Sequence, residues 1–339
     1  MTKMAYTRYR IFISFTITIL FSWLLLQQLD WATLRTAPSV LSIPLLGMAI
    51  GFLVMGYSIR IFRWWWILRA LEPQLPLQAC FWPFVAGIAV NNLLPLRAGD
   101  VYRILGFRQH LHSPASRLFG TLLIERWLDL TILLLLFFIG LLATTPAAIP
   151  KRFTYLAAAI AGICIVLILA VWLFVPRLHH LTDRIAANPF LTRHGWGERL
   201  HHFIDHLTQS LLISRNPRLT GQLLLLSLLG WGFEGAVFAV VAEALASGVN
   251  FPGAWFALAT GTLATLLPSS PGYFGTFDYF TMRGLIAYGA RPEMAAVTAL
   301  IIHLVLWIPI TLVGISYFLL PKSWISRTST SIAPESPRS

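Results

Sequence analysis

The stretch 91-NNLLPLRAGDVYR-103 decides how this chain folds. It follows an apolar run, Ala79 to Val90, that is too short to cross a bilayer and return. Proline lacks an N–H and restricts the residue before it, so we predict that a helix ends near Leu94. Gly99 permits a tight backbone after that break. The sequence therefore predicts an interrupted helix rather than a plain membrane span.

Three charged side chains, Arg97, Asp100 and Arg103, lie within seven consecutive residues of this stretch. Charge at membrane depth is costly and usually marks a pathway, a pocket or an ion pair. The alternative is an interfacial loop whose arginines contact lipid phosphates. Charge and spacing alone leave both interpretations open.

The composition is that of an integral membrane protein. The 339 residues are 57% hydrophobic and 11% charged, whereas soluble domains have about 25% charged residues. The net charge is +12. Because the basic residues lie beside apolar spans, they indicate anionic lipid and membrane topology rather than nucleic acid. We expect one transmembrane domain over residues 1–322 and a disordered tail over 323–339.

Hydrophobic segments of about 20 residues predict six full transmembrane helices in an all-α polytopic fold. The N-terminal segment lacks a small-x-small cleavage site and is interpreted as an uncleaved span. The six segments are Ile11–Gln28, Ile43–Phe62, Phe119–Leu141, Phe153–Val175, Leu219–Ala246 and Met294–Leu320. Two further regions, Gln78–Arg117 and Phe251–Ala290, are interrupted by proline and glycine.

Basic residues predict the orientation, because they favour the cytoplasmic side. They gather at both ends of the chain, after the second span, after the first interrupted region and in the loop 176–218. The residues outside that loop are Lys3, Arg8, Arg10, Arg60, Arg63, Arg69, Arg103, Arg108, Arg117, Lys322, Arg327 and Arg338. Both termini are therefore expected in the cytoplasm, with the protein in the inner cell membrane.

With this orientation, each interrupted region begins and ends on one side of the membrane. We predict two re-entrant helical hairpins that enter from opposite faces. Their tips are similar, Asn92-Leu93-Leu94-Pro95 against Thr265-Leu266-Leu267-Pro268. Inverted repeats with broken helices are typical of secondary transporters. The alternative is eight plain spans with kinks.

The loop 176–218 contains six of the nine histidines. Leu200, Phe203, Ile204, Leu207 and Leu211 fall on one helical face, which predicts an amphipathic helix in this cytoplasmic loop. No HExxH pattern or acidic ligand cluster accompanies the histidines, so we interpret them as a solvated face and expect no metal.

Three sets of motifs resemble one family. They are Asn91…Pro95-x-Arg97-x-Gly99-Asp100-x-x-Arg103, then Glu125-Arg126-x-x-Asp129, then Pro268-x-x-Pro271-Gly272-x-x-Gly275-x-x-Asp278. In this order they resemble the lysylphosphatidylglycerol synthase/flippase membrane-domain family of bacteria and archaea. The family's best-known member continues into a soluble aminoacyl-transfer domain. This sequence stops soon after Leu320, so the resemblance implies the membrane half only.

The polar residues of these motifs divide into candidate roles. We expect a lipid head group to bind residues at the hairpin tips and nearby arginines: Arg97, Arg103, Arg126, Asn91, Asn92, Ser269 and Ser270. Glu125, Asp129 and Asp100 are interpreted as ion-pair partners, with Arg97, Arg103 or Arg126 neutralising the first two. The tips themselves are formed by Pro95, Gly99, Pro268, Pro271, Gly272 and Gly275.

Three further ionisable residues are candidates for proton coupling: Glu234, Asp278 and His303. Glu234 lies among glycines in an apolar segment, and its alternative role is a protonated group bonded to a neighbouring helix. His303 is a possible partner of Glu234 or Asp278, and its alternative role is packing.

These features favour a lipid transporter that binds an anionic phosphate head group and moves the lipid between leaflets. The resemblance implies a phospholipid, polyprenyl-phosphate or hopanoid partner and no cofactor. The rival is a membrane enzyme, or subunit, that transfers a group such as a glycosyl to or from a lipid carrier. A third reading is a scaffold for lipid-biosynthesis enzymes.

Overall fold

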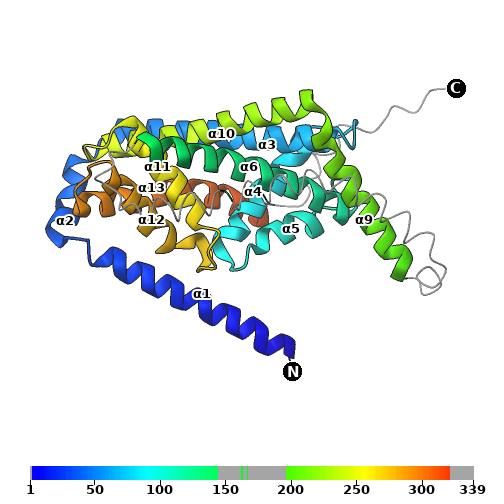
Figure 1. Cartoon of the computed structure of the whole chain (residues 1–339), viewed down its shortest axis with the longest axis horizontal. Coiled ribbons are helices and arrows are strands. Elements are labelled where there is room, and N and C mark those ends of the chain that lie inside the picture. Colours follow the sequence, from blue (N-terminus) through cyan, green and yellow to red (C-terminus); the bar gives the residue numbers. More distant parts are fainter. Residues whose placement is uncertain (1, 144–161, 163–165, 167–195, 321–339) are drawn as a thin grey trace.

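The computed structural model describes residues 2–143, 162, 166 and 196–320, and within these ranges the regular elements are all helices (Figure 1). The predicted span Phe153–Val175 lies outside the described residues except at two positions. The tail 323–339 and residues 176–195 of the predicted loop also lie outside them. The all-α fold is confirmed, whereas the domain limits stay a prediction.

Four helices are long and apolar enough to cross a membrane: α3 (Ile43–Arg69), α6 (Ala115–Ala143), α10 (Pro217–Ala244) and α13 (Pro292–Leu319). They correspond to four of the six predicted spans. The first predicted span falls on α1 (Thr2–Leu26), which has a shorter apolar part, Ile13–Leu26. The short α2 (Trp31–Val40) follows it. A multi-pass membrane protein is thus supported, and the total of six spans stays a prediction.

Two pairs of short helices lie between the long ones. The first pair is α4 (Gln78–Leu93) and α5 (Ala98–Gly106). The second is α11 (Phe251–Ala264) and α12 (Thr276–Ala287), whose connection contains the 3-10 turn η2 (Pro271–Tyr273). The predicted end of a helix near Leu94 is confirmed. In chain order, a long helix, a short pair and a long helix occur twice.

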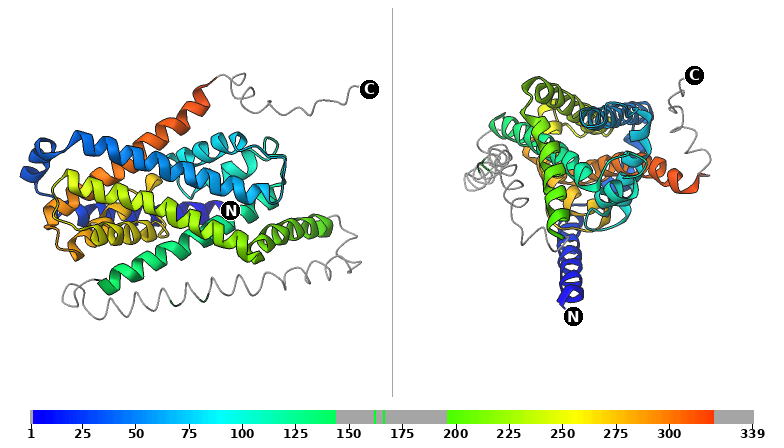
Figure 2. Two further views of the ribbon diagram at one scale, coloured as in Figure 1. Left: turned by 90° about the horizontal axis from the view of Figure 1, so that it is seen from above. Right: turned by 90° about the vertical axis from the view of Figure 1, so that its right-hand side faces the viewer.

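The long helices α3 and α10 lie side by side in both views of Figure 2. A Cβ at Gly56 of α3 would be 3.4 Å from the carbonyl oxygen of Gly230 of α10. Small residues at such a crossing let two helices approach closely, which is how membrane helices gain packing contacts. This close pair forms one wall of the bundle, and its Arg60, Arg63 and Glu234 side chains line the interior.

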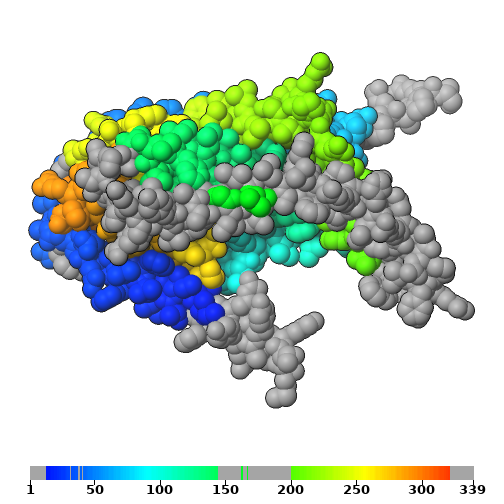
Figure 3. Space-filling view, in the orientation of Figure 1, coloured from blue at the N-terminus to red at the C-terminus, as the bar shows by residue number. Residues whose placement is uncertain are grey.

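The two short connections meet in the middle of the molecule. The guanidinium Nη2 of Arg97, between α4 and α5, donates to the carbonyl oxygen of Thr265, after α11, at 3.4 Å. Figure 3 shows the segment after α11 against the α4–α5 pair, with α1 beside them. The backbone N–H of Ser270 also donates to the Thr18 hydroxyl of α1 at 2.8 Å.

The turn between α4 and α5 depends on Asn91 and Gly99. The Asn91 side-chain oxygen accepts from the backbone N–H of Gly99 at 2.7 Å and of Asp100 at 3.2 Å, which caps α5. The left-handed residues of the turn are Leu96 and Arg97, with φ of 64° and 54°. Gly99 is needed for another reason than backbone freedom, because a Cβ there would overlap the carbonyl oxygen of Gly87.

The predicted amphipathic helix is present as α9 (Trp196–Leu212), and the short turn η1 (Ile213–Arg215) leads from it to α10. Its buried face differs in part from the prediction. Thr208 and Ser210 are buried, whereas Phe203 is 43% exposed. The reason is a close approach to α6, where a Cβ on Gly120 would clash with the Ser210 side chain.

We expect Gly99→Ala to destabilise the fold, because the new methyl group meets backbone atoms of α4 that cannot move independently. Overpacking of this kind costs about 1–3 kcal/mol of unfolding free energy. The measurement is the melting temperature of the purified protein in one detergent.

The matched control is Gly51→Ala in α3, where a Cβ has nothing within 4 Å. It should leave the melting temperature unchanged or raise it, since alanine favours helix. Equal melting temperatures for the two variants would contradict the close packing of α5 on α4.

Candidate functional site

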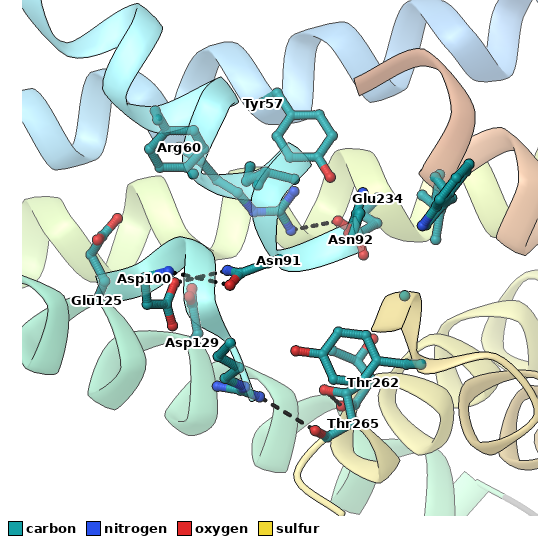
Figure 4. Close-up of a pocket in the computed structure, with 18 of the residues that line it drawn as sticks. Tyr57, Arg60, Asn91, Asn92, Asp100, Glu125, Asp129, Glu234, Thr262 and Thr265 are labelled. Atoms are coloured by element: carbon teal, nitrogen blue, oxygen red, sulfur yellow. Dashed lines mark hydrogen bonds and ion pairs between the residues drawn. The ribbon is translucent and has the colours of Figure 1, made fainter. Parts of the chain in front are cut away.

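A cavity of about 250 Å³ lies where the two short helical pairs meet the long helices (Figure 4). Figure 4 shows Asn91 and Asp100 on one side of it and Thr262 and Thr265 on the other. Nine charged residues line it: Arg60, Arg63, Arg97, Arg103, Arg126, Asp100, Glu125, Asp129 and Glu234. This is an unusually high concentration of charge for the interior of an apolar bundle.

Arg103 forms an ion pair with Glu125, which packs α5 against α6. The Arg103 guanidinium lies 4.3 Å from the centre of the Trp64 ring and 5.2 Å from that of Phe84. The residue is only 7% exposed. We predicted Arg103 as a head-group ligand as well as a possible partner of Glu125. Its contacts fit the second role, because its charge is already balanced within the protein.

Arg63 of α3 is the main partner of Asp129. The sequence alone did not predict this pairing. Its Nη1 lies 2.6 Å from Asp129 Oδ1 and 2.7 Å from the Ser227 hydroxyl of α10. Its Nη2 is 3.9 Å from Glu125. The Trp231 indole N–H donates to the same Asp129 oxygen at 3.1 Å. One buried guanidinium therefore joins α3, α6 and α10.

Arg60 of α3 pairs with Glu234 of α10 at 2.6 Å. Its guanidinium lies 4.5 Å from the Trp231 ring centre and 5.5 Å from that of Tyr57. Glu234, a candidate for proton coupling or for a protonated group bonded to a neighbouring helix, thus has an arginine partner on the adjacent helix. Arg60 and Arg63, which were expected to follow the second span, lie within α3, because this helix continues to Arg69. Gly56, Arg60 and Arg63 follow the i, i+4, i+7 spacing of one helix face, a signal that could have located them.

Arg126 pairs with Asp100 rather than with the carboxylates of its own helix. Its Nη2 lies 2.8 Å from Asp100 Oδ2, and the Arg126 side chain is 44% exposed. Of the three arginines expected to neutralise Glu125 and Asp129, Arg103 pairs with Glu125, whereas Arg126 forms its ion pair with Asp100. Successive residues of a helix point about 100° apart, so Arg126 and Glu125 reach different residues of α5, Asp100 and Arg103 respectively.

Arg97 differs from the other four arginines, because it has no carboxylate partner among the described residues. Its guanidinium donates to the Thr265 carbonyl oxygen at 3.4 Å. Four buried donors of residues that line the cavity lack a hydrogen-bond partner within the described part of the chain: Arg60 Nη2, Arg63 Nε, the Thr262 hydroxyl and the Trp307 indole N–H. This part of the cavity offers unsatisfied donors and suits an anion.

A second cavity of about 350 Å³ adjoins the first, between α1 and the two tips. Four residues line both cavities: Asn91, Arg97, Thr265 and Tyr273. The hydroxyls of Ser14, Ser269 and Ser270 are buried and without partners in the described residues. Leu94, Leu96, Leu266 and Leu267 add a largely exposed apolar rim. The Arg97–Thr265 contact stands between the two spaces.

The remaining predicted residues fall around these cavities. Asn91 uses its amide to cap α5 and to donate to Asp100 at 3.0 Å, and Asn92 donates to Thr311 of α13 at 2.7 Å. Pro95 and Pro268 line the second cavity, and Pro271 begins η2. Gly272 and Gly275 have φ of 67° and 78°, which glycine adopts without strain.

His303 of α13 and Asp278 of α12 form a buried pair. His303 Nδ1 lies 2.6 Å from Asp278 Oδ1, and Nε2 lies 2.9 Å from the Gly272 carbonyl oxygen. A carbonyl only accepts, so Nε2 carries a proton, and the short Nδ1–Oδ1 contact requires a second one. The pair is therefore neutral overall. No cluster of three or more metal-ligating His, Cys, Asp or Glu occurs among the described residues.

Two comparisons with known proteins agree with this architecture. A model of the lysylphosphatidylglycerol synthase TM region matches residues 11–314. UPF0104 membrane protein MJ1078 of Methanocaldococcus jannaschii is 25% identical over 190 residues, which cover 56% of this chain and 76% of the relative. The match to the family model spans nearly all of the helices described above, and the chain therefore belongs to the lysylphosphatidylglycerol synthase transmembrane-region family.

Proposed function

We propose that this protein binds a membrane lipid by its anionic phosphate head group and moves it between the two leaflets. The observation that carries the proposal is Arg97, a guanidinium without a carboxylate partner in the described chain, placed where two cavities meet. Arginine binds phosphate oxygens through two parallel hydrogen bonds. A phosphate bound to Arg97 would be accessible from both cavities.

The two pairs of short helices serve in this proposal as re-entrant hairpins from opposite membrane faces. Supporting this, a long helix, a short pair and a long helix occur in the order α3–α6 and again in α10–α13. Non-helical backbone at membrane depth is tolerated where it lines a cavity, and both tips do so. Inverted repeats with broken helices at a central site are typical of transporters. Both termini would then be cytoplasmic.

Transfer of the head group follows from this arrangement. The phosphate leaves one cavity for the other when the Arg97–Thr265 contact opens, while Arg97 stays bound to the phosphate. Ser269 and Ser270 offer hydroxyls on the second side, and Thr262 and Trp307 offer donors on the first. Arg103 and Arg126 act mainly as partners of carboxylates. Asn91 and Asn92 position the tip against α5 and α13.

Proton coupling is assigned to Asp278 and His303. Their pair holds a shared proton beside Gly272, a residue of the first cavity. Loss of that proton leaves two acceptors facing each other, which repel and loosen the tip. Glu234 is excluded from this role in the proposal, because Arg60 balances its charge.

The rival function, group transfer on a lipid carrier, needs a free acid or base in the cavity. The four carboxylates that line the first cavity each have an arginine partner, and both ring nitrogens of His303, which also lines it, are bonded to Asp278 and Gly272. This distribution favours transport. A scaffold for lipid-biosynthesis enzymes would bind no lipid at Arg97. The liposome experiment below distinguishes a scaffold from a transporter.

In liposomes that contain a labelled phospholipid, Arg97→Lys should bind and move the lipid less well than the wild type. Lysine keeps the charge but loses the paired hydrogen bonds. The loss of one charge-assisted bond of about 1.5–3 kcal/mol predicts a roughly tenfold to hundredfold weaker affinity. Lipid binding, transbilayer movement and melting temperature are measured on the same samples.

Arg108→Gln is the control, since Arg108 is an exposed arginine of the same region that lines neither cavity. It should behave as the wild type. Unchanged lipid affinity in Arg97→Lys together with a lower melting temperature would make Arg97 structural. A change in the mass of the lipid would favour the enzyme instead.

His303→Gln should abolish the response of transport to a pH gradient across the liposome membrane. Glutamine can still bond Asp278 or Gly272 but cannot carry the imidazole proton. The expected result is the same rate with and without the gradient, with lipid affinity retained. A gradient response equal to that of the wild type would remove His303 from the coupling.

A further inference from the structure

We infer that the lipid carried by this protein has a head group with a single negative charge and no ammonium group, that is, a phosphodiester whose remaining part is uncharged. This inference rests on the proposed function and concerns which lipid the first cavity accepts. It follows from the balance of charges around the cavity and from how firmly each carboxylate is held.

The first cavity has one positive charge in excess. Five arginines and four carboxylates line it. Asp278 does not line it, and the His303–Asp278 pair is neutral with its shared proton, so the balance is unaffected. An uncompensated charge in an apolar bundle is costly. The lowest free energy is therefore reached with one added negative charge beside Arg97.

A phosphodiester supplies this charge, because it carries one negative charge near neutral pH. A phosphomonoester carries about −1.5 to −2 at pH 7. Its additional charge would need a further cation, and each of the other four arginines already faces a carboxylate. The cavity thus favours the diester over the monoester. The free donors, Thr262 and Trp307, suit neutral or anionic oxygens equally.

An ammonium group finds no free carboxylate in the cavity. Glu125 is held by Arg103, whose guanidinium contacts the Trp64 and Phe84 rings. Glu234 is held by Arg60, which contacts Trp231 and Tyr57. These arginines are fixed by aromatic rings as well as by charge, so a lipid amine must displace them to pair.

The same reasoning applies to an aminoacylated lipid. A lysyl ester adds two ammonium groups to the single phosphate charge, so its head group carries net positive charge. The first cavity already has a positive excess and would repel it. The structure assigns this member of the family to an anionic lipid rather than to the lysylated lipid in the family's name.

The test measures binding to the full-length protein at pH 7.5 by native mass spectrometry with four lipids of equal acyl chains. They are phosphatidylglycerol, phosphatidate, phosphatidylethanolamine and lysylphosphatidylglycerol. We expect phosphatidylglycerol to bind at least about tenfold more tightly than each of the others, the factor for about 1.4 kcal/mol.

Charge variants make the test specific. Glu234→Gln raises the excess to two positive charges while keeping the side-chain shape, and should shift preference toward phosphatidate. Arg97→Gln removes the excess and should abolish the preference for anionic lipid. Glu243→Gln, an exposed residue of the same helix α10 that lines neither cavity, should match the wild type.

The outcomes separate this inference from the proposed function. Transport of labelled lipid together with equal or tighter binding of phosphatidate or lysylphosphatidylglycerol would overturn the charge assignment alone. So would an unchanged preference in Glu234→Gln and Arg97→Gln. Absence of both lipid binding and lipid movement in the wild type would overturn the proposed function, and the charge assignment with it.

Discussion

Burial of arginine inside an apolar helical bundle is the constraint on which the rest of this structure depends. A guanidinium cannot lose its charge in a protein, so it requires a carboxylate or a ligand. Arg63 meets this requirement by joining α3 to α6 and α10, and Arg60 joins α3 to α10. The resulting ion pairs fix the rotation of the long helices about their axes, because each carboxylate must face its arginine. The cavity is the space left between them.

Arg97, in the short connection between α4 and α5, is the exception, because it has no carboxylate partner among the described residues. Asn91 caps α5 and Gly99 allows α5 to lie directly on α4, so the turn is held by groups that carry no charge. Two left-handed non-glycine residues, Leu96 and Arg97, lie in this turn. Such backbone costs of order 1–3 kcal/mol per residue and persists where the surroundings impose it. The imposed turn points an arginine toward the opposite tip instead of toward a carboxylate.

Much of the framework was predictable from the sequence. Pro95 indicated the break at Leu94, and hydrophobic length indicated four of the long helices. The pairing of His303 with Asp278 was anticipated as one of two possibilities. The ion pairs were mostly missed, because they depend on helix rotation rather than on proximity in the chain. Arg126 adjoins Glu125 in sequence but pairs with Asp100, and Arg63 lies 66 residues from Asp129.

The strengths of these contacts indicate which parts move in the proposed transport. The pairs Arg60–Glu234 and Arg63–Asp129 have 2.6 Å separations and are largely buried, whereas the Arg97–Thr265 contact is 3.4 Å long and joins a charge to a neutral carbonyl. A phosphate replaces that carbonyl as a stronger acceptor. In the proposed transport, binding of the lipid would therefore contribute to separating the tips, while the paired arginines keep the long helices in place.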